Sequence, residues 1–450
     1  MSTDGRRRSA ARWIAVWLAI AALLPSTVQA APPVLSAHPL DSAGLGEEIL
    51  GLSERIPLVL VHGILSDHRV WDAYAGDVTG DAFLRRKFKP YYFEYTAFQS
   101  QILPGDPRTI RQIGAAFGDA IEGAALRDRP LSIVAHSMGG LVARSFMQEW
   151  TLGARRGGDR TLRLTTLATP HHGTPIADEA DLATLADVVL EQSRDLAWDK
   201  FDGTDATGHT NAWLRCLNDS PSTHFDTESC ATDAERQQPR FFERVVAIGA
   251  GANGTFSDSL LQLGALFLSR QPPVGHFADN DGVVSVPSAL FEGWPVLSRL
   301  RVGSCDHFRL PRGECQPGGQ SLFPRLLGPL AWVGTDRRSY RPDQPIVLTF
   351  ESRAGLAGDT TGVDLFFGNV SEDGTVWWLG VDGRWTTAEV PAAVGWTVPD
   401  LAGISVAFTD GRPGRHAWLV RLVRPGTGIV DYSLAVYTID PLAPPADGDV

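Results

Sequence analysis

Apolar and polar positions follow two different rhythms along the chain, and the change of rhythm divides it into parts. From residue 57, continuous apolar runs such as 57–63, 131–137 and 163–170 alternate with longer segments whose apolar residues recur at helical spacing. Such runs are typical of parallel strands buried on both faces, and the segments between them are typical of covering helices. We therefore predict an α/β domain with a mostly parallel sheet over residues 55–328.

This rhythm is interrupted after Pro175. Leu182, Leu185 and Val189 recur at helical spacing, a polar stretch follows them, and strand character returns only at 244–250. An insertion of this length within a sheet is usually a lid or cap over the site. We predict that residues 176–240 form such a lid or cap insertion, with the three apolar side chains facing the pocket or an interface.

The last part of the chain contains short apolar segments separated by Gly, Pro and Asp turns, with almost no helical periodicity. This pattern predicts an all-β, immunoglobulin-like sandwich over residues 341–440, with the boundary between 328 and 341. Four tryptophans within it form either a carbohydrate- or polymer-binding face or part of the core: Trp377, Trp378, Trp385 and Trp396. Aromatic residues at strand spacing are more often core.

The first thirty residues have the organisation of a secretory signal peptide. Four arginines precede an apolar run over 13–24, and the small residues Val28 and Ala30 follow. A membrane anchor is the alternative, but this run is shorter than the roughly 20 residues that a spanning helix needs. We expect a signal peptide over 1–30, a linker over 31–54, and secretion to an extracellular or periplasmic location.

Composition excludes some functions. The chain has a formal charge of −12, and removing the leader, which carries four arginines and one aspartate, makes it about −15. A charge of this sign repels nucleic acid. We expect no nucleic-acid partner, and composition alone does not set the oligomeric state.

The four cysteines are an even number in a chain expected to reach an oxidising compartment: Cys216, Cys230, Cys305 and Cys315. Two disulfides are the natural interpretation, and the sequential pairing keeps both loops local. A zinc site is the alternative, but no C-x-x-C pair is present. A disulfide between Cys305 and Cys315 would enclose His307, so we expect its reduction to lower turnover before the sheet unfolds. The alternative is a disulfide that only protects an exposed loop from proteolysis.

One short motif carries the candidate chemistry. In the segment 135–139, Ala-His-Ser-Met-Gly, an apolar strand ends at a serine and a helical pattern begins. A strand followed by x-x-Ser-x-Gly and a helix is typical of a nucleophile elbow, in which a sharp turn exposes the serine oxygen. The alternative is a structural serine in a glycine-rich turn. We interpret Ser137 as the nucleophile, and the neighbouring His136 as structural.

A nucleophilic serine needs a histidine, a carboxylate and donors for an oxyanion. The chain order Ser, Asp, His, usual for this kind of domain, selects Asp281 and His307. The backbone amides of Ile64 and Met138 are the expected oxyanion donors. The alternatives are Asp279 for the acid, and His62 or His276 for the base.

The motifs VHGIL, AHSMGGLVAR, LATPHHGTP, NDGVVS and DHF occur in the order seen in secreted bacterial triacylglycerol lipases and related α/β-hydrolases, which residues 55–328 therefore resemble. The resemblance implies Ser137 as nucleophile, Asp281 as orienting acid and His307 as base, with His171 and His172 structural. Many of these lipases have a calcium-binding aspartate two residues after the catalytic histidine, where this chain has Arg309. A calcium site of this type is therefore not expected; Asp279 is the alternative ion ligand, and we expect no metal. The triad chemistry requires no cofactor.

These observations predict a secreted serine hydrolase that cleaves carboxylic esters, with lipid acyl esters as the expected substrates and transient contact with a lipid interface. A thioesterase, a polyester depolymerase and an acyltransferase share the same triad and remain alternatives. A protein with a catalytically silent hydrolase fold, used for adhesion or binding, is the alternative outside enzymes.

Overall fold

The structure is a computed structural model. It describes residues 33–37, 55–64, 66–96, 109–124, 126, 129–178, 192, 195–198, 211–218, 238–271, 275–315, 321–356 and 359–441. Some predictions concern segments that lie wholly or mostly outside these ranges: the leader 1–30, the linker 31–54 and the lid 176–240. Cys230 and the three apolar residues Leu182, Leu185 and Val189 also lie outside them. No helix within the described ranges is long and apolar enough to cross a membrane.

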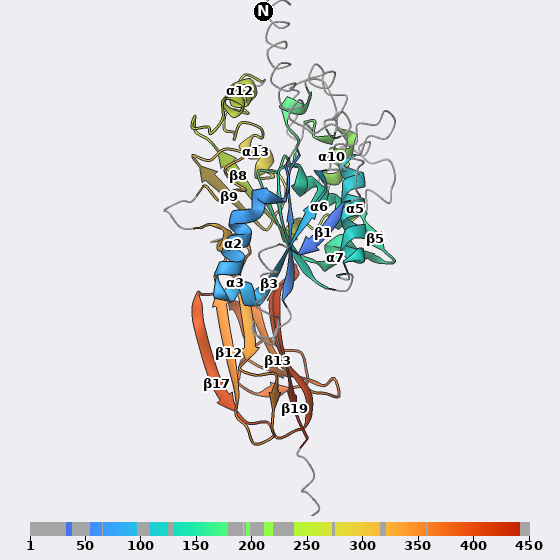
Figure 1. Ribbon diagram of the computed structural model, residues 1–450, viewed down its shortest axis with the longest axis vertical. Coiled ribbons are helices and arrows are strands. Elements are labelled where there is room, and N and C mark those ends of the chain that lie inside the picture. The colour runs from blue at the N-terminus through green and yellow to red at the C-terminus, as the bar shows by residue number, and fades with distance from the viewer. Residues whose placement is uncertain are drawn as a thin grey trace, which may run out of the picture. The chain divides into compact units, whose positions relative to one another are not determined.

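A seven-stranded sheet is the centre of the first part of the chain (Figure 1). Its spatial order is β1-β3-β2-β4-β7-β8-β9, and the pairs from β2 to β9 are parallel. The strands are β1 (Val34–Ala37), β2 (Ile56–Val61), β3 (Phe88–Glu94), β4 (Leu131–His136), β7 (Thr161–Leu167), β8 (Val245–Gly251) and β9 (Ser298–Gly303). β2, β4 and β8 are buried along their whole length, in keeping with their largely apolar sequences. β7 is equally buried, although it contains Arg163 and three threonines.

Two helices of this part show how local sequence positions the site. Thr109 and Gln112 form a capping box that begins α5 (Ile110–Gly123), and the helix buries a stripe that includes Ile113, Phe117 and Ile121. α5 packs against α6 (Met138–Glu149), which follows β4 directly. Figure 1 shows α5, α6 and α7 together beside the central sheet.

The remaining elements of this part are short. They are η2 (His68–Trp71), α2 (Asp72–Gly80), α3 (Ala82–Lys87), β5 (Thr151–Leu152), β6 (Arg155–Arg156), α7 (Gly157–Arg160), η3 (Pro175–Asp178), α10 (Ala212–Asn218), η4 (Phe242–Arg244), α12 (Ser259–Leu268), α13 (Val286–Ala289) and α14 (Phe323–Leu326).

The later part of the chain is all-β and consists of two sheets. One has the order β10-β12-β17, and the other has the order β11-β19-β18-β13-β14-β15 with β16 beside β13. The strands are β10 (Leu330–Thr335), β11 (Ser339–Tyr340), β12 (Ile346–Arg353), β13 (Val363–Val370), β14 (Val376–Leu379), β15 (Trp385–Thr386), β16 (Ala393–Trp396), β17 (Leu401–Phe408), β18 (Gly414–Arg424) and β19 (Gly428–Ile439). Val333, Ile346, Val420 and Tyr437 come from both sheets and belong to one hydrophobic core.

The predicted fold class, a parallel α/β sheet followed by an all-β region, is confirmed. β10 lies in the stretch where the boundary was predicted, and it pairs antiparallel with β12. The chain divides into two compact units, and residues 75–90, which include α3 and the first residues of β3, group with the all-β region. The exact domain limits and the immunoglobulin-like topology stay predictions.

Candidate active site

Ser137 occupies the turn between β4 and α6. Its backbone has φ 53° and ψ −132°, a conformation that is strained for any residue with a side chain. Strain of this kind persists where surrounding packing holds it, and it is common at active sites. The side chain is 5% exposed. The local geometry is therefore that of a strand–turn–helix elbow.

Two glycines make room for this turn. A Cβ atom on Gly139 would lie 2.3 Å from the backbone oxygen of His62, and one on Gly63 would lie 2.8 Å from the Cβ of Ser137. The close approach at Gly139 is thus to the end of the neighbouring strand β2, rather than to the serine's own strand. Any side chain at either position would push the elbow and the loop after β2 apart.

Ser137, His307 and Asp281 form a continuous chain of hydrogen bonds. The Ser137 Oγ lies 3.0 Å from the His307 Nε2, and the His307 Nδ1 lies 2.8 Å from the Asp281 Oδ2. Both His307 and Asp281 are buried, at 3% and 0% exposed. If Nδ1 carries the proton and donates it to the carboxylate, Nε2 is the acceptor that faces the serine hydroxyl.

The loop between α12 and α13 holds the Asp281 carboxylate in place. Its Oδ1 accepts hydrogen bonds from the amides of Val283 and Val284, at 2.9 and 2.8 Å, which leaves Oδ2 for His307. Asp279, the alternative acid, instead forms a two-pronged ion pair with Arg301 and is 44% exposed. The structure therefore brings Asp281, and not Asp279, to the histidine.

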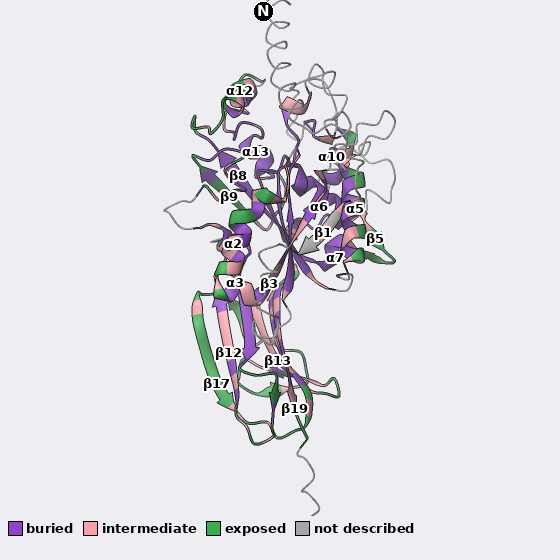
Figure 2. Ribbon diagram, in the orientation of Figure 1, coloured by how far each residue is buried: buried purple, intermediate pink, exposed green. Residues whose placement is uncertain are grey.

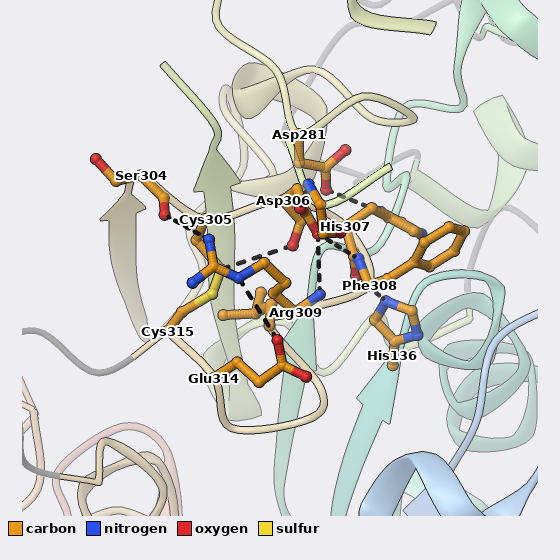
Figure 3. The surroundings of a disulfide bond; sticks show 12 residues. His136, Asp281, Ser304, Cys305, Asp306, His307, Phe308, Arg309, Glu314 and Cys315 are labelled. Carbon is orange, nitrogen blue, oxygen red and sulfur yellow. Dashed lines mark hydrogen bonds and ion pairs between the residues drawn. A yellow bond between two sulfur atoms is a disulfide. The ribbon is translucent and has the colours of Figure 1, made fainter. Parts of the chain in front are cut away.

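The loop that carries His307 is fastened at several points (Figure 3). A disulfide joins Cys305 to Cys315, as predicted, and closes the loop around the histidine. The His307 amide donates to the Asp281 backbone oxygen at 3.0 Å. Asp306 accepts from the amides of Phe308 and Arg309 at 3.1 and 3.0 Å.

The second predicted disulfide is only half described. Cys216 is disulfide-bonded, whereas Cys230 lies outside the described residues. The pairing of Cys216 with Cys230 therefore stays a prediction.

His136 has a more specific place than the sequence indicated. Its Nε2 donates to the His307 backbone oxygen at 3.0 Å. The backbone of His307 is therefore held at its oxygen by His136 and at its amide by Asp281. Burial, together with the nearby His307, lowers the pKa of His136 well below its usual value. His136 is therefore neutral at ordinary pH and acts as a fixed donor.

The two expected oxyanion donors lie at the elbow and in the facing loop. Met138 is the first residue of α6, so its amide is among the helix amides that have no intrahelical acceptor. Ile64 follows Gly63 in the loop after β2. Within the described residues, neither amide donates a hydrogen bond.

Glu94, which sequence reasoning missed, holds the loop of Ile64. At the end of β3, its carboxylate accepts hydrogen bonds from the His62 Nε2 at 3.1 Å and the His68 Nδ1 at 3.0 Å, on either side of Ile64. It also accepts from the His68 amide at 3.1 Å and the Thr96 amide at 2.9 Å. Nothing in the strand pattern of 89–96 distinguishes this glutamate from an ordinary exposed strand residue.

The charge of Glu94 is strongly favoured. Burial alone would raise the pKa of its carboxyl, but hydrogen bonds from His62, Thr96 and His68 hold that pKa far below the usual value. Glu94 is therefore ionised at every pH at which an esterase would be assayed. Both ring nitrogens of His62 have partners, because Nε2 contacts Glu94 and Nδ1 lies 2.9 Å from the Gly63 oxygen. These contacts argue against His62 as the base.

The other histidines considered have structural surroundings. His171 lies between the hydroxyl of Thr166 and the guanidinium of Arg144, and burial lowers its pKa well below the usual value. His172 contacts the Glu292 backbone oxygen at 2.9 Å. His276 packs edge-on against the ring of Trp198. Within the described residues, no group of three or more His, Cys, Asp or Glu side chains is placed to hold a metal ion.

Comparison with protein families gives one match. The model of a family described as "Domain of unknown function (DUF7379)" matches residues 37–217, which is less than half of the chain. No curated protein matches the chain.

Solved structures with similarity to this chain include hydrolases. The lipase BlEst2 of Bacillus licheniformis, in its propeptide form, is 15% identical with a TM-score of 0.39, and 85% of this chain and 75% of that chain are covered. An esterase from Thermogutta terrifontis is 13% identical with a TM-score of 0.29, and the coverage is 57% and 84%. These similarities are too weak to carry an argument about activity. Any such argument rests on the residues of the site, where a parallel sheet presents a hydrogen-bonded Ser137, His307 and Asp281.

Proposed function

We propose that this protein is a serine hydrolase that cleaves carboxylic esters through an acyl-enzyme. The observation that carries the proposal is the hydrogen-bond chain from the Ser137 Oγ through the His307 ring to the Asp281 carboxylate. A serine hydroxyl is a weak nucleophile until a histidine accepts its proton, and the histidine needs a carboxylate to fix its tautomer. The histidine and the carboxylate both reach the serine at the strained turn of Ser137 through this chain of hydrogen bonds.

In the acylation step, the Ser137 Oγ attacks the acyl carbon of the ester while the His307 Nε2 accepts the hydroxyl proton. The imidazolium that forms is stabilised by Asp281, which stays ionised. The amides of Ile64 and Met138 donate to the oxygen that becomes negatively charged. When the intermediate collapses, the bond from carbon to the alcohol oxygen breaks, and His307 gives its proton to the departing alcohol.

In the deacylation step, a water molecule replaces the alcohol. His307 accepts a proton from this water as its oxygen attacks the acyl carbon of the acyl-serine. The bond to the Ser137 Oγ then breaks, the serine recovers its proton from His307, and the carboxylic acid leaves. The sequence of steps requires no cofactor.

The substrates we propose are lipid acyl esters, and the location we propose is outside the cytoplasm. The motif order shared with secreted bacterial lipases supports the substrate class. The leader pattern of residues 1–30 and the disulfide of Cys305 with Cys315 support secretion, because disulfides persist mainly in oxidising compartments. Thioesterase, polyester depolymerase and acyltransferase activities use the same triad and differ only in the acyl donor and acceptor. A silent, adhesive protein would have no need of the ordered triad.

The chemistry is tested with soluble nitrophenyl esters and the mature chain from residue 31. We expect Ser137→Ala to reduce turnover by on the order of 10⁴- to 10⁶-fold with an unchanged circular dichroism spectrum. Ser132→Ala, on the same buried strand, is the matched control and should retain full activity. Ester hydrolysis by Ser137→Ala at the wild-type rate would refute the proposal.

The substrate class is tested with the same enzyme on nitrophenyl esters of increasing acyl length, below and above their solubility limit. A lipase should prefer long chains and accelerate once the substrate forms an interface. A hyperbolic response with short-chain preference would point to a soluble-ester esterase, and a preference for acyl thioesters would point to a thioesterase.

A further inference from the structure

The all-β region contains a cavity of about 660 Å³ that is lined by residues of both of its sheets. This volume is within the range of about 300–1,000 Å³ that is usual for ligand pockets. Its walls come from both sheets and are rich in aromatic rings, namely Phe367, Trp377, Trp385, Phe408 and Trp418. Figure 2 shows that β17, which provides part of this wall, is exposed along most of its length.

Two of these rings are presented to solvent. Trp377 is 39% exposed and Trp385 is 43% exposed, whereas the indole of Trp378 between them in sequence is only 5% exposed. The Trp385 ring packs beside Trp418, with ring centroids 5.8 Å apart, and beside Phe367 at 6.5 Å. An exposed indole held by other rings is a rigid apolar platform.

The sequence left two alternatives for the four tryptophans, a binding face or part of the core, and each applies to two of them. Trp378 belongs to the interior, and Trp396 packs against the hydrophobic core beside Phe350. Trp377 and Trp385 line the cavity.

Polar groups adjoin the aromatic walls. A second hollow, of about 490 Å³, shares Trp377 and Arg412 with the cavity and is also lined by His416 and Ser371. His416 is 3% exposed, and its Nε2 donates to the Arg412 backbone oxygen at 2.9 Å. In the neutral ring this leaves Nδ1 as an acceptor. Among the described residues, neither Nδ1 of His416 nor Oγ of Ser371 has a hydrogen-bond partner.

Polar atoms that lack a partner within the chain can be satisfied by a ligand hydroxyl or by water. A hydroxyl group can donate to the imidazole acceptor and exchange hydrogen bonds with the serine. A hydrocarbon chain would cover the aromatic walls but would leave both atoms unpaired, which is unfavourable.

The charges around the two hollows exclude an anionic ligand. The Arg412 guanidinium is bound by Asp410, with Nε to Oδ1 at 2.9 Å and Nη2 to Oδ2 at 2.8 Å, so the pair is neutral. Glu372 and Asp373 add two negative charges. Carboxylates, phosphates and the head groups of acidic lipids would be repelled.

We propose that this cavity binds neutral hexose units of a polysaccharide or glycan. A pyranose ring has an apolar face of C–H groups that stacks on indole rings, and a rim of uncharged hydroxyls that suits His416 and Ser371. The proposal concerns the all-β region alone and does not depend on the esterase activity.

The test is affinity electrophoresis of the full mature chain in native gels that contain a neutral hexose polymer, with a β-glucan, an α-glucan and a galactomannan tried separately. We expect at least one polymer to retard the chain. Trp385→Ala should weaken binding by on the order of 10-fold or more, since a central aromatic contact carries much of the affinity. Val381→Ala, at an exposed apolar residue outside the cavity wall, is the control and should bind as the wild type.

Trp377→Ala is the second variant and is measured alongside Trp385→Ala. Soluble nitrophenyl ester hydrolysis should be unchanged in either variant, which separates this site from the candidate active site. The proposal is overturned if no neutral polymer retards the chain, or if every tryptophan variant that folds binds as tightly as the wild type. It is also overturned if the chain binds only phosphatidylcholine vesicles or polyester particles, because the ligand would then be a hydrophobic surface.

Discussion

At the scale of single residues, Glu94 is the side chain outside the proposed triad that contributes most to the shape of the candidate site. Its carboxylate connects His62 and His68, and so it holds the loop that presents the Ile64 amide. A small displacement of an oxyanion donor weakens its effect on the charged intermediate. Glu94 is therefore a positioning residue and does not touch the reacting atoms.

We expect Glu94→Gln to lower kcat by about 10-fold with little change in KM, because binding of the uncharged ester does not need the oxyanion donors. The measurement is steady-state kinetics on a soluble ester. Glu122→Gln, which removes an acid paired with Arg160, is the control. An unchanged kcat in Glu94→Gln would show that the loop holds its shape without this carboxylate.

The same variant should alter the pH dependence of stability. The folded pKa of Glu94 lies below its ordinary value of 4.5, so its contribution is complete above about pH 4.5 and is lost as the pH falls toward the folded pKa. We expect Glu94→Gln to be about 1.5 to 3 kcal/mol less stable than the wild type at neutral pH. Urea unfolding should show this difference narrowing in acid, and a constant difference would contradict the assignment.

At the scale of elements, the loop of His307 is held by two separate devices. The Cys305–Cys315 disulfide closes it, while hydrogen bonds from His136 and to Asp281 hold the backbone on both sides of the histidine. From the sequence alone we expected reduction of the disulfide to lower turnover directly. The hydrogen bonds change this expectation, because they position the ring without the covalent bond.

We now expect the double variant Cys305→Ser with Cys315→Ser to lose about 2.5 to 3 kcal/mol of stability, the chain-entropy value for so short a loop. Its turnover at 25 °C should fall less than about 3-fold. His136→Phe, which keeps a ring and removes the hydrogen-bond donor, should by itself lower turnover modestly. When it is combined with the double cysteine variant, the fold-loss of turnover should be larger than the product of the two separate fold-losses. Simple multiplication of the effects would show that the two devices act independently.

At the scale of the whole molecule, a buried ion pair joins distant parts of the sequence inside the second compact unit. The Lys87 Nζ, at the end of α3, lies 2.8 Å from the Asp431 Oδ1 on β19 and donates to the Ala331 backbone oxygen at 2.7 Å. Both side chains are 2% exposed. Residues 82–87 are therefore part of how the all-β region is stabilised, although the sequence places them between two strands of the central sheet.

We expect Lys87→Met to cost about 3 to 5 kcal/mol, because it leaves Asp431 buried and uncompensated. The double variant Lys87→Met with Asp431→Leu should be more stable than Lys87→Met alone. Urea unfolding of the two variants and the wild type provides the comparison. A double variant less stable than Lys87→Met would contradict this expectation.

Local sequence determined the elements of the fold and the elbow of the site. Continuous apolar runs specify buried strands, and a serine with small neighbours between a strand and a helix specifies the turn at Ser137, because both signals depend only on residues close in the chain. Motif order further selected Asp281 and His307, and the structure brings both within hydrogen-bond reach. Their catalytic roles stay proposals.

Only the tertiary structure decided which side chains support these elements. His136 and the backbone of His307 are 171 residues apart, and Glu94 and His62 are 32 apart, so no local pattern reports either contact. The cavity at Trp377 and Trp385 likewise depends on how two sheets close. A strand pattern indicates which side chains share a face. It does not indicate whether the opposing sheet covers that face, because coverage is set by packing between segments that are distant in sequence.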